Sequence, residues 1–326
     1  MHLRQAMRGN VPLTDGGVRA HLQSMEHAID YIPKEEVRRM AKRSDLWGAW
    51  LTVHVWGVIA LAVAAYIIFP NPFVFAASFL IIGSRQHGLS ILAHDTAHGV
   101  MFQNRKLNEF VGKYFLAAPY GGDMIAYRHY HLKHHRHTQS ENDPDLPLSA
   151  KFPTTKASLR RKFLRDITGR TYLRLRIASW KMRKGGEKVE GSDAFQKSSP
   201  IPFFVSNAIL FGIFILIGHP WLYLTLWLLP MWTWMFAVLR LRNIAEHAVT
   251  TNDDNPLTHA RTTHANVIER ILFAPYWVNY HVEHHAYMFV PCYRLKALHK
   301  AMVANGHEPD MEIQNDYGAV LKLASA

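Results

Sequence analysis

Two pairs of long apolar runs constrain what this chain can fold into. They are Leu46–Phe69, Pro72 to about Ala93, Ile201–Ile217 and Trp221 to about Leu241. Each run approaches the ~20 residues that a helix needs to cross a bilayer, and charged residues are nearly absent from them. Tight turns at residues 70–72 and 218–220 join the runs of each pair. The sequence therefore predicts an all-α integral membrane protein with four transmembrane helices in two hairpins. Buried helices of a soluble protein are the weaker interpretation, because two adjacent runs of this kind occur twice.

The distribution of basic residues predicts how the hairpins are oriented. Both turns lack Lys and Arg, whereas the N-terminal, middle and C-terminal segments carry nearly all of the 37. By the positive-inside rule these three segments, and therefore both termini, face the cytosol. We expect one domain over residues 1–326, which divides into five parts along the chain. These are a cytosolic N-terminal segment (1–45), the first hairpin (46–93), a cytosolic helical cap (94–200), the second hairpin (201–241) and the rest of the cap (242–326).

The formal net charge of +12 allows two kinds of partner, nucleic acid or anionic lipid. Much of the positive charge lies between Lys156 and Lys184, where apolar residues recur among basic ones, as is typical of amphipathic helices on a membrane surface. Contact with lipid is the first interpretation of this face, and docking of an acidic electron-transfer partner is the alternative. Nucleic acid is not expected as a partner, because the bilayer would cover this face.

Histidine is the residue type that points to chemistry. The 21 histidines include three boxes: HDTAH at 94–98, HLKHH at 131–135 and HVEHH at 281–285. Residues three and four apart share one face of a helix, so each box directs two or three imidazoles to one place. In random order this composition would give an HxxHH pattern about 0.09 times, and here it occurs twice. Eight imidazoles exceed what one tetrahedral zinc takes and suit two metals. The single cysteine, Cys292, excludes a cysteine-based metal site.

A ninth candidate ligand follows the fourth apolar run. His247 lies four residues after Asn243, so both side chains are expected to project from one helical face just beyond the membrane. His247 is a candidate direct ligand, and Asn243 is a candidate for holding a metal-bound water. An ordinary histidine at a helix end is the alternative.

With its three boxes in this order, the sequence is similar to the membrane fatty acid desaturase family, and to its acyl-lipid desaturases in particular. The resemblance covers roughly residues 46 to 300, and it includes Asp143-Pro144-Asp145 after the second box and Val290-Pro291 after the third. It implies a single desaturase-like domain with a four-helix membrane stem, a cytosolic cap and two non-haem irons. The ligands that it implies are His94, His98, His131, His134, His135, His247, His281, His284 and His285, with Asn243 acting through water.

The sequence departs from some branches of this family. Three residues separate the histidines of the first box, where acyl-CoA delta-9 enzymes have four, and the third box begins with His281 rather than the Gln of front-end desaturases. The chain contains no cytochrome b5 haem motif and no GxGxxG nicotinamide fingerprint. We therefore expect electrons to come from a separate donor, such as a ferredoxin or a cytochrome b5-type protein.

Other polar residues in or near the boxes have candidate supporting roles. Asp95, Glu246 and Glu283 are placed to orient imidazoles by accepting hydrogen bonds, although helix capping and solvated carboxylates are equal alternatives. His87 lies seven residues before His94, two turns along the same helical face, and is a candidate for lining the site.

The expected function is O2-dependent introduction of a double bond into a fatty acyl chain. The same site is suited to hydroxylation, ketolation or oxidative decarboxylation of a lipid, carotenoid or small amphiphile. A membrane metal transporter is a remote alternative, since the runs offer little besides His54 and Asn207 for a polar path. A zinc hydrolase is equally remote, because nine histidines exceed its needs.

Overall fold

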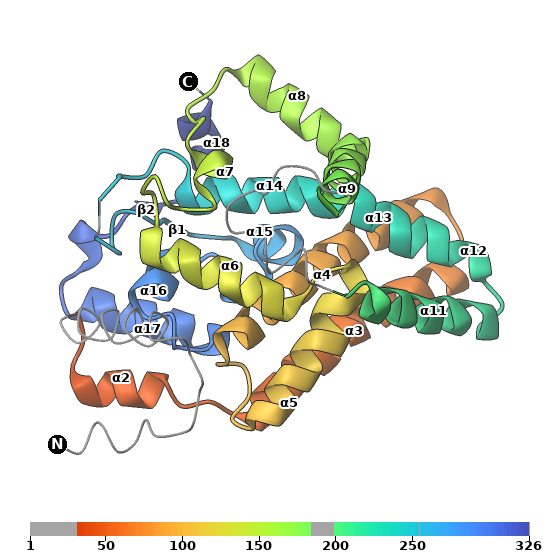
Figure 1. Cartoon of the computed structure of the whole chain (residues 1–326), viewed down its shortest axis with the longest axis horizontal. Coiled ribbons are helices and arrows are strands. Elements are labelled where there is room, and N and C mark those ends of the chain that lie inside the picture. Colours follow the sequence, from red (N-terminus) through yellow and green to blue (C-terminus); the bar gives the residue numbers. More distant parts are fainter. Residues whose placement is uncertain (1–30, 184–198, 254, 326) are drawn as a thin grey trace.

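The computed structural model describes residues 31–183, 199–253 and 255–325 (Figure 1). Predictions that fall on residues 1–30 and 184–198, including most of the N-terminal segment, lie outside this part of the chain. The described residues are mostly helical. Two strands of two residues each, β1 (Thr262–Thr263) and β2 (Ile313–Gln314), pair in parallel, so the predicted all-α class omitted a small β element.

The first hairpin consists of α3 (Asp45–Ile68) and α4 (Pro72–His98). The Asn71 side chain accepts hydrogen bonds from the backbone N–H groups of Phe73 and Val74, which starts α4 directly after the turn. The Ser78 hydroxyl donates to the carbonyl of Ala62 at 2.8 Å and joins the two helices. Because the C-terminal half of α4 is buried, it runs out of the hairpin and into the core of the cap.

The second hairpin is less regular. Its first helix is α11 (Ile201–Leu216), and its return limb consists of α12 (Pro220–Leu222), the π-helix η3 (Tyr223–Leu228), α13 (Leu229–Trp232) and α14 (Trp234–His247). The buried Asn207 amide oxygen accepts from the Tyr223 hydroxyl and the Trp227 indole N–H, both at 3.0 Å. Among apolar neighbours these bonds satisfy the amide and fix α11 against the return limb.

Two of these helical runs are long and apolar enough to cross a membrane, namely Asp45–Ile68 and Pro220–His247. The apolar helix α11 is shorter, at 16 residues. Among the described residues, α4 is long enough, at 27 residues, but it is not one of these two candidate spans. Its second half carries Arg85, Gln86, His87 and the first histidine box. The four helical limbs are present, while their number of membrane crossings remains a prediction.

The cap is built from short helices on both sides of the second hairpin. Before the hairpin lie α2 (Lys34–Met40), α5 (Arg105–Phe110), the π-helix η1 (Val111–Ala117), η2 (Ala118–Tyr120), α6 (Met124–His137), α7 (Leu146–Ser149), α8 (Lys156–Ile167) and α9 (Arg170–Arg183). After it lie β1, α15 (Val267–Leu272), η4 (Pro275–Trp277), α16 (His281–Ala286), α17 (Cys292–Ala304), η5 (Glu308–Asp310), β2 and α18 (Tyr317–Ala324). In Figure 1, α11 to α13 lie at the right, whereas α2, α16 and α17 lie at the opposite end.

The basic segment beginning at Lys156 forms two helices, α8 and α9. Their exposed apolar side chains are Leu164, Ile167, Leu173, Leu175, Ile177 and Trp180. The buried Asp166 carboxylate of α8 pairs with Arg240 of α14, which fixes this helix to the second hairpin. Both helices therefore expose apolar and basic side chains at the surface of the protein, as the sequence pattern predicts.

Candidate metal centre

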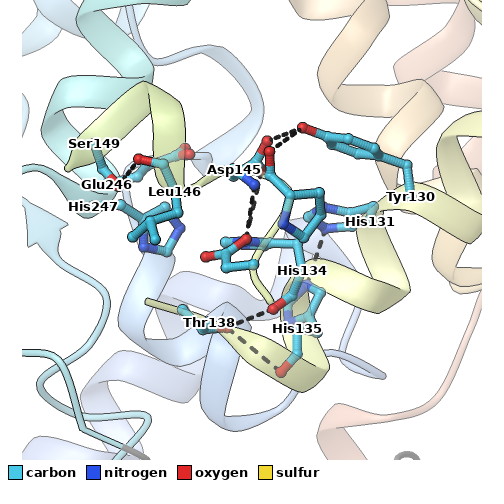
Figure 2. A network of polar contacts seen from close by, with 12 residues as sticks. Tyr130, His131, His134, His135, Thr138, Asp145, Leu146, Ser149, Glu246 and His247 are labelled. Carbon is cyan, nitrogen blue, oxygen red and sulfur yellow. Dashed lines mark hydrogen bonds and ion pairs between the residues drawn. The ribbon is translucent and has the colours of Figure 1, made fainter. Parts of the chain in front are cut away.

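Four helices carry the nine predicted histidine ligands to one place. They are α4 (His94, His98), α6 (His131, His134, His135), α14 (His247) and α16 (His281, His284, His285). Figure 2 shows the three α6 histidines across from Glu246 and His247 of α14. All nine side chains are buried or half-buried, although they come from segments up to about 190 residues apart in the sequence. Burial of so many polar rings in one cluster requires partners for their nitrogens.

Five histidines form a first group, in which one ligand atom from each residue lies within 4.8 Å of the others: His94, His98, His131, His135 and His284. His135 Nε2 lies 2.9 Å from His131 Nε2 and 3.0 Å from His284 Nε2. The first and second boxes thus share this group with one histidine of the third box.

The remaining four histidines adjoin the first group. The ligand atoms of His134, His247 and His285 lie within 4.8 Å of one another, and so do those of Glu246, His247 and His281. His281 Nε2 is 2.9 Å from His247 Nε2 and 3.1 Å from His285 Nε2. The ring centroids of His135 and His285 are 4.4 Å apart, which places the second group directly beside the first.

The donor chemistry of both groups fits two metal ions. Pairs of imidazole nitrogens at 2.9–3.1 Å can share only one proton, and they present lone pairs to a common point. His94 Nε2 is buried and has no hydrogen-bond partner among the described residues. An imidazole-rich environment of this kind suits iron, zinc or copper.

The charge state of these histidines also favours metal binding. Burial, together with the neighbouring histidines, lowers the pKa of His131, His135, His284 and His285 well below 6.5, and the pKa of His281 shifts in the same direction. Metals bind the neutral form of imidazole, so these rings are ready to act as ligands near neutral pH.

Carboxylates hold the second box in position. The His134 Nδ1–H group donates to Asp143 at 2.8 Å, and Asp143 also accepts from the backbone N–H of Gln139 at 2.8 Å. Asp145 lies 3.6 Å from the same ring nitrogen and accepts from the Tyr130 hydroxyl at 2.5 Å (Figure 2). A carboxylate on the outer nitrogen fixes the orientation of the ring and increases its basicity toward a metal.

Backbone and hydroxyl oxygens do the same for other rings. His247 Nδ1 lies 3.1 Å from the carbonyl of His259, so this nitrogen carries the proton and Nε2 is left to bind a metal. His285 Nδ1 lies 3.5 Å from the Thr138 hydroxyl, which in turn donates to the carbonyl of His134 at 2.9 Å (Figure 2).

The other predicted site residues fall into two classes. Asn243 and Glu246 line a pocket together with His134, His247 and His281, so they face the second group. Asp95 accepts from the backbone N–H of Cys292 at 2.7 Å and is 3.4 Å from His94, so its main contact joins α4 to α17.

Glu283 and His87 lie outside the metal groups. Glu283 contacts Thr262 and His299, both at 2.5 Å. His87 is fully buried and its Nδ1 lies 3.3 Å from the Ser90 hydroxyl. Neither partner of the Glu283 carboxylate, Thr262 or His299, is a box histidine, so these contacts do not orient a box imidazole directly.

Sequence reasoning assigned no role to Asp143, Thr138, Gln139 or Arg242. The Asp143-Pro144-Asp145 sequence was visible after the second box, but its contact with His134 depends on a reversal of the chain after α6. Gln139 makes this reversal with a φ of 62°, a left-handed backbone conformation that a non-glycine residue rarely adopts.

The helical fold and its paired histidine groups define a candidate dimetal protein with long apolar helices. Residues 69–314 match the family model described as fatty acid desaturase, and the chain belongs to this family. Its relatives include dihydrorhizobitoxine desaturase of Bradyrhizobium elkanii, 25% identical over 71% of this chain and 67% of the relative. The sn-1 oleoyl-lipid 12-desaturase of Synechocystis is 23% identical over 86% of this chain and 82% of its own length. A beta-carotene ketolase of a Paracoccus species is 23% identical over 77% of this chain and 88% of the ketolase.

Proposed function

We propose that this chain is an O2-dependent membrane diiron oxidase that introduces a double bond into a fatty acyl chain. The observation that carries the proposal is the pair of adjoining histidine groups, buried in a member of the fatty acid desaturase family. Five imidazoles are the proposed ligands of one iron and four imidazoles those of the other, with Asn243 acting through a water.

The irons, when bound, supply with O2 an oxidant strong enough to remove hydrogen from an unactivated C–H bond. Desaturation consumes one O2, two electrons and two protons; two hydrogens leave adjacent carbons, a C=C bond forms and two waters are released. A separate one-electron donor protein, a ferredoxin or a cytochrome b5-type protein, is the proposed source of the electrons. The protein holds the imidazoles neutral and oriented, and the surrounding apolar residues exclude bulk water from them.

A four-span topology suits this chemistry. Exposed apolar side chains cover α3 and α11, including Leu46 (84% exposed) and Leu216 (86%), as expected for surfaces that contact lipid. In the proposed topology both termini and the cap face the cytosol, and all residues form one domain. The metal groups then lie at the membrane surface, where an acyl chain can enter from the bilayer.

A second outcome at the same site is oxygenation, in which one oxygen atom enters the product and the other leaves as water. The ketolases among the relatives favour it as the alternative, with a carotenoid or another amphiphile as substrate. Placement of the substrate relative to the metals decides between the two outcomes, and the shared histidine groups serve both.

Profiling the lipids of cells that express the chain tests this proposal. We expect a product two hydrogens lighter than its precursor, detected as methyl esters and as intact lipids, and absent from cells that express His134→Ala. A product heavier by one oxygen would reassign the chain to the oxygenases. If both strains had the same lipids while a reductase and donor protein were co-expressed, the proposed desaturation would be contradicted.

A further inference from the structure

Tyr276 and Trp277, in the turn η4 before the third histidine box, have an unusual backbone. Their φ angles are 56° and 58°, so two successive non-glycine residues adopt the left-handed conformation. This conformation is costly for bulky residues and persists only where the surroundings enforce it. The Tyr276 side chain is buried and reaches the first hairpin, which supplies these surroundings.

Three residues of the first hairpin hold the Tyr276 ring. Its hydroxyl lies 3.0 Å from Nδ1 of His54 on α3, and the guanidinium of Arg85 on α4 lies 5.6 Å from the ring centroid. Arg85 also donates to the carbonyl of Ile271 in the last turn of α15, so α4 contacts the chain before and within the turn. Gly88 lets the ring approach α4, since a Cβ at this position would lie 2.7 Å from Cε2 of Tyr276.

His54 is one of the few polar side chains in the four apolar runs, and the proposed reaction gives it no role. It is half-buried on α3, a helix long and apolar enough to cross a membrane. Ionisable groups in such helices are costly and mark function more often than stability. The contact with Tyr276 satisfies one nitrogen of this imidazole and links α3 to the turn before the third box.

The third box depends on this turn for its position. The helix α16 has only six residues, and its N-cap, Tyr280, makes no capping bond through its side chain. So short a helix is not stable alone, and the segments that adjoin it set its position. Four residues separate Tyr276 from His281, and among them Asn279 makes two hydrogen bonds of 3.0 Å to the backbone of Thr263. A displacement of Tyr276 therefore reaches α16 along a short, constrained segment.

The helix α16 contributes to both metal groups. His284 belongs to the five-histidine group, whereas His281 and His285 belong to the second group. A shift of α16 would therefore change the arrangement of imidazoles in both groups at once.

From this geometry we propose that Tyr276 is a positioning residue for the third histidine box, and that its contacts with His54 and Arg85 couple the first hairpin to both metal groups. This inference rests on the proposed diiron function and leaves its ligand set unchanged.

The test compares Tyr276→Phe, His54→Leu and the double variant in the purified full-length chain loaded with cobalt(II). Cobalt(II) binds imidazole sites of the same kind as iron, and its absorption spectrum reports ligand geometry without turnover. The matched control is Tyr223→Phe, which removes a tyrosine hydroxyl from its bond to Asn207 within the second hairpin.

We expect each single variant to shift the cobalt spectrum and to lower the affinity for cobalt about 10-fold, because misplaced imidazoles bind the metal less well. The double variant should lose no more than either single variant, since both substitutions break the same contact. Tyr223→Phe should keep the affinity and the spectrum of the unsubstituted chain.

Unchanged cobalt binding in folded Tyr276→Phe, additive losses in the double variant, or an equal loss in Tyr223→Phe would overturn the inference. If Tyr276→Phe does not fold, His54→Leu decides alone, since an apolar side chain in an apolar helix does not oppose insertion. Unchanged cobalt binding in that variant would overturn the inference as well. If the variants shift cobalt binding as expected while expression of the unsubstituted chain leaves cell lipids unchanged, the proposed function fails and the inference stands.

Discussion

The His284→Ala variant is expected to lose product formation by more than about 100-fold while it still inserts into membranes. His284 is buried, and its Nε2 is 3.0 Å from His135 Nε2 within the five-histidine group. It lies on a short helix of the cap, away from the two apolar runs that are long enough to cross a membrane. Removing its imidazole therefore affects the proposed metal centre and leaves membrane insertion intact. The measurement compares product per membrane-bound chain, and His134→Ala should behave in the same way.

His129→Ala is the matched control, since His129 lies on α6 beside the second box but is exposed. We expect it to keep the activity of the unsubstituted chain. Normal turnover by His284→Ala, or an equal loss in His129→Ala, would contradict the assignment of His284 as a ligand.

The stability of the metal-free protein is expected to fall steeply with pH below 6.5. Burial and neighbouring histidines lower the pKa of at least five box histidines from 6.5 in the folded state, among them His131 and His284. Above pH 6.5 these groups are neutral in both states and contribute no pH dependence. Below it the unfolded chain takes up protons that the folded protein resists, at about 1.4 kcal/mol per pH unit for each histidine.

Denaturant unfolding of the metal-free protein in detergent, at about pH 7.5 and about pH 5.5, measures this effect. Burial raises the pKa of Glu246 to about 7 and that of Asp95 to about 6, so these two carboxylates oppose the histidine effect in this range, but the histidines outnumber them. His284→Ala removes one of the contributing groups and should show a smaller difference between the two pH values. Equal stability at both pH values would show that the buried histidines are protonated in the folded protein.

The local grouping of the histidines was predictable, because residues three and four apart on a helix share a face. Their division between the two metal groups was not. His284 belongs to the first group and its neighbour His285 to the second, since successive residues on a helix point about 100° apart. Which group each one faces depends on how α16 packs between α6 and α14, a tertiary relation that spacing does not encode.

The supporting contacts were less accessible from the sequence. The bond between Asp143 and His134 depends on a chain reversal, and that between Arg242 and Glu246 acquires meaning only beside His281. The hairpins were visible as apolar runs, but α4 proved longer than the run that revealed it. It extends to His98, and its last turns are buried in the cap, where Asp95 accepts a hydrogen bond from the backbone of Cys292.

Metal analysis of the purified full-length chain, combined with Mössbauer spectroscopy after expression with enriched iron, tests the central claim most directly. The account predicts two irons per chain with two distinguishable spectral components, because the two histidine groups differ in their ligands. Zinc in place of iron under iron-sufficient expression, or a single metal per chain in folded protein, would contradict it.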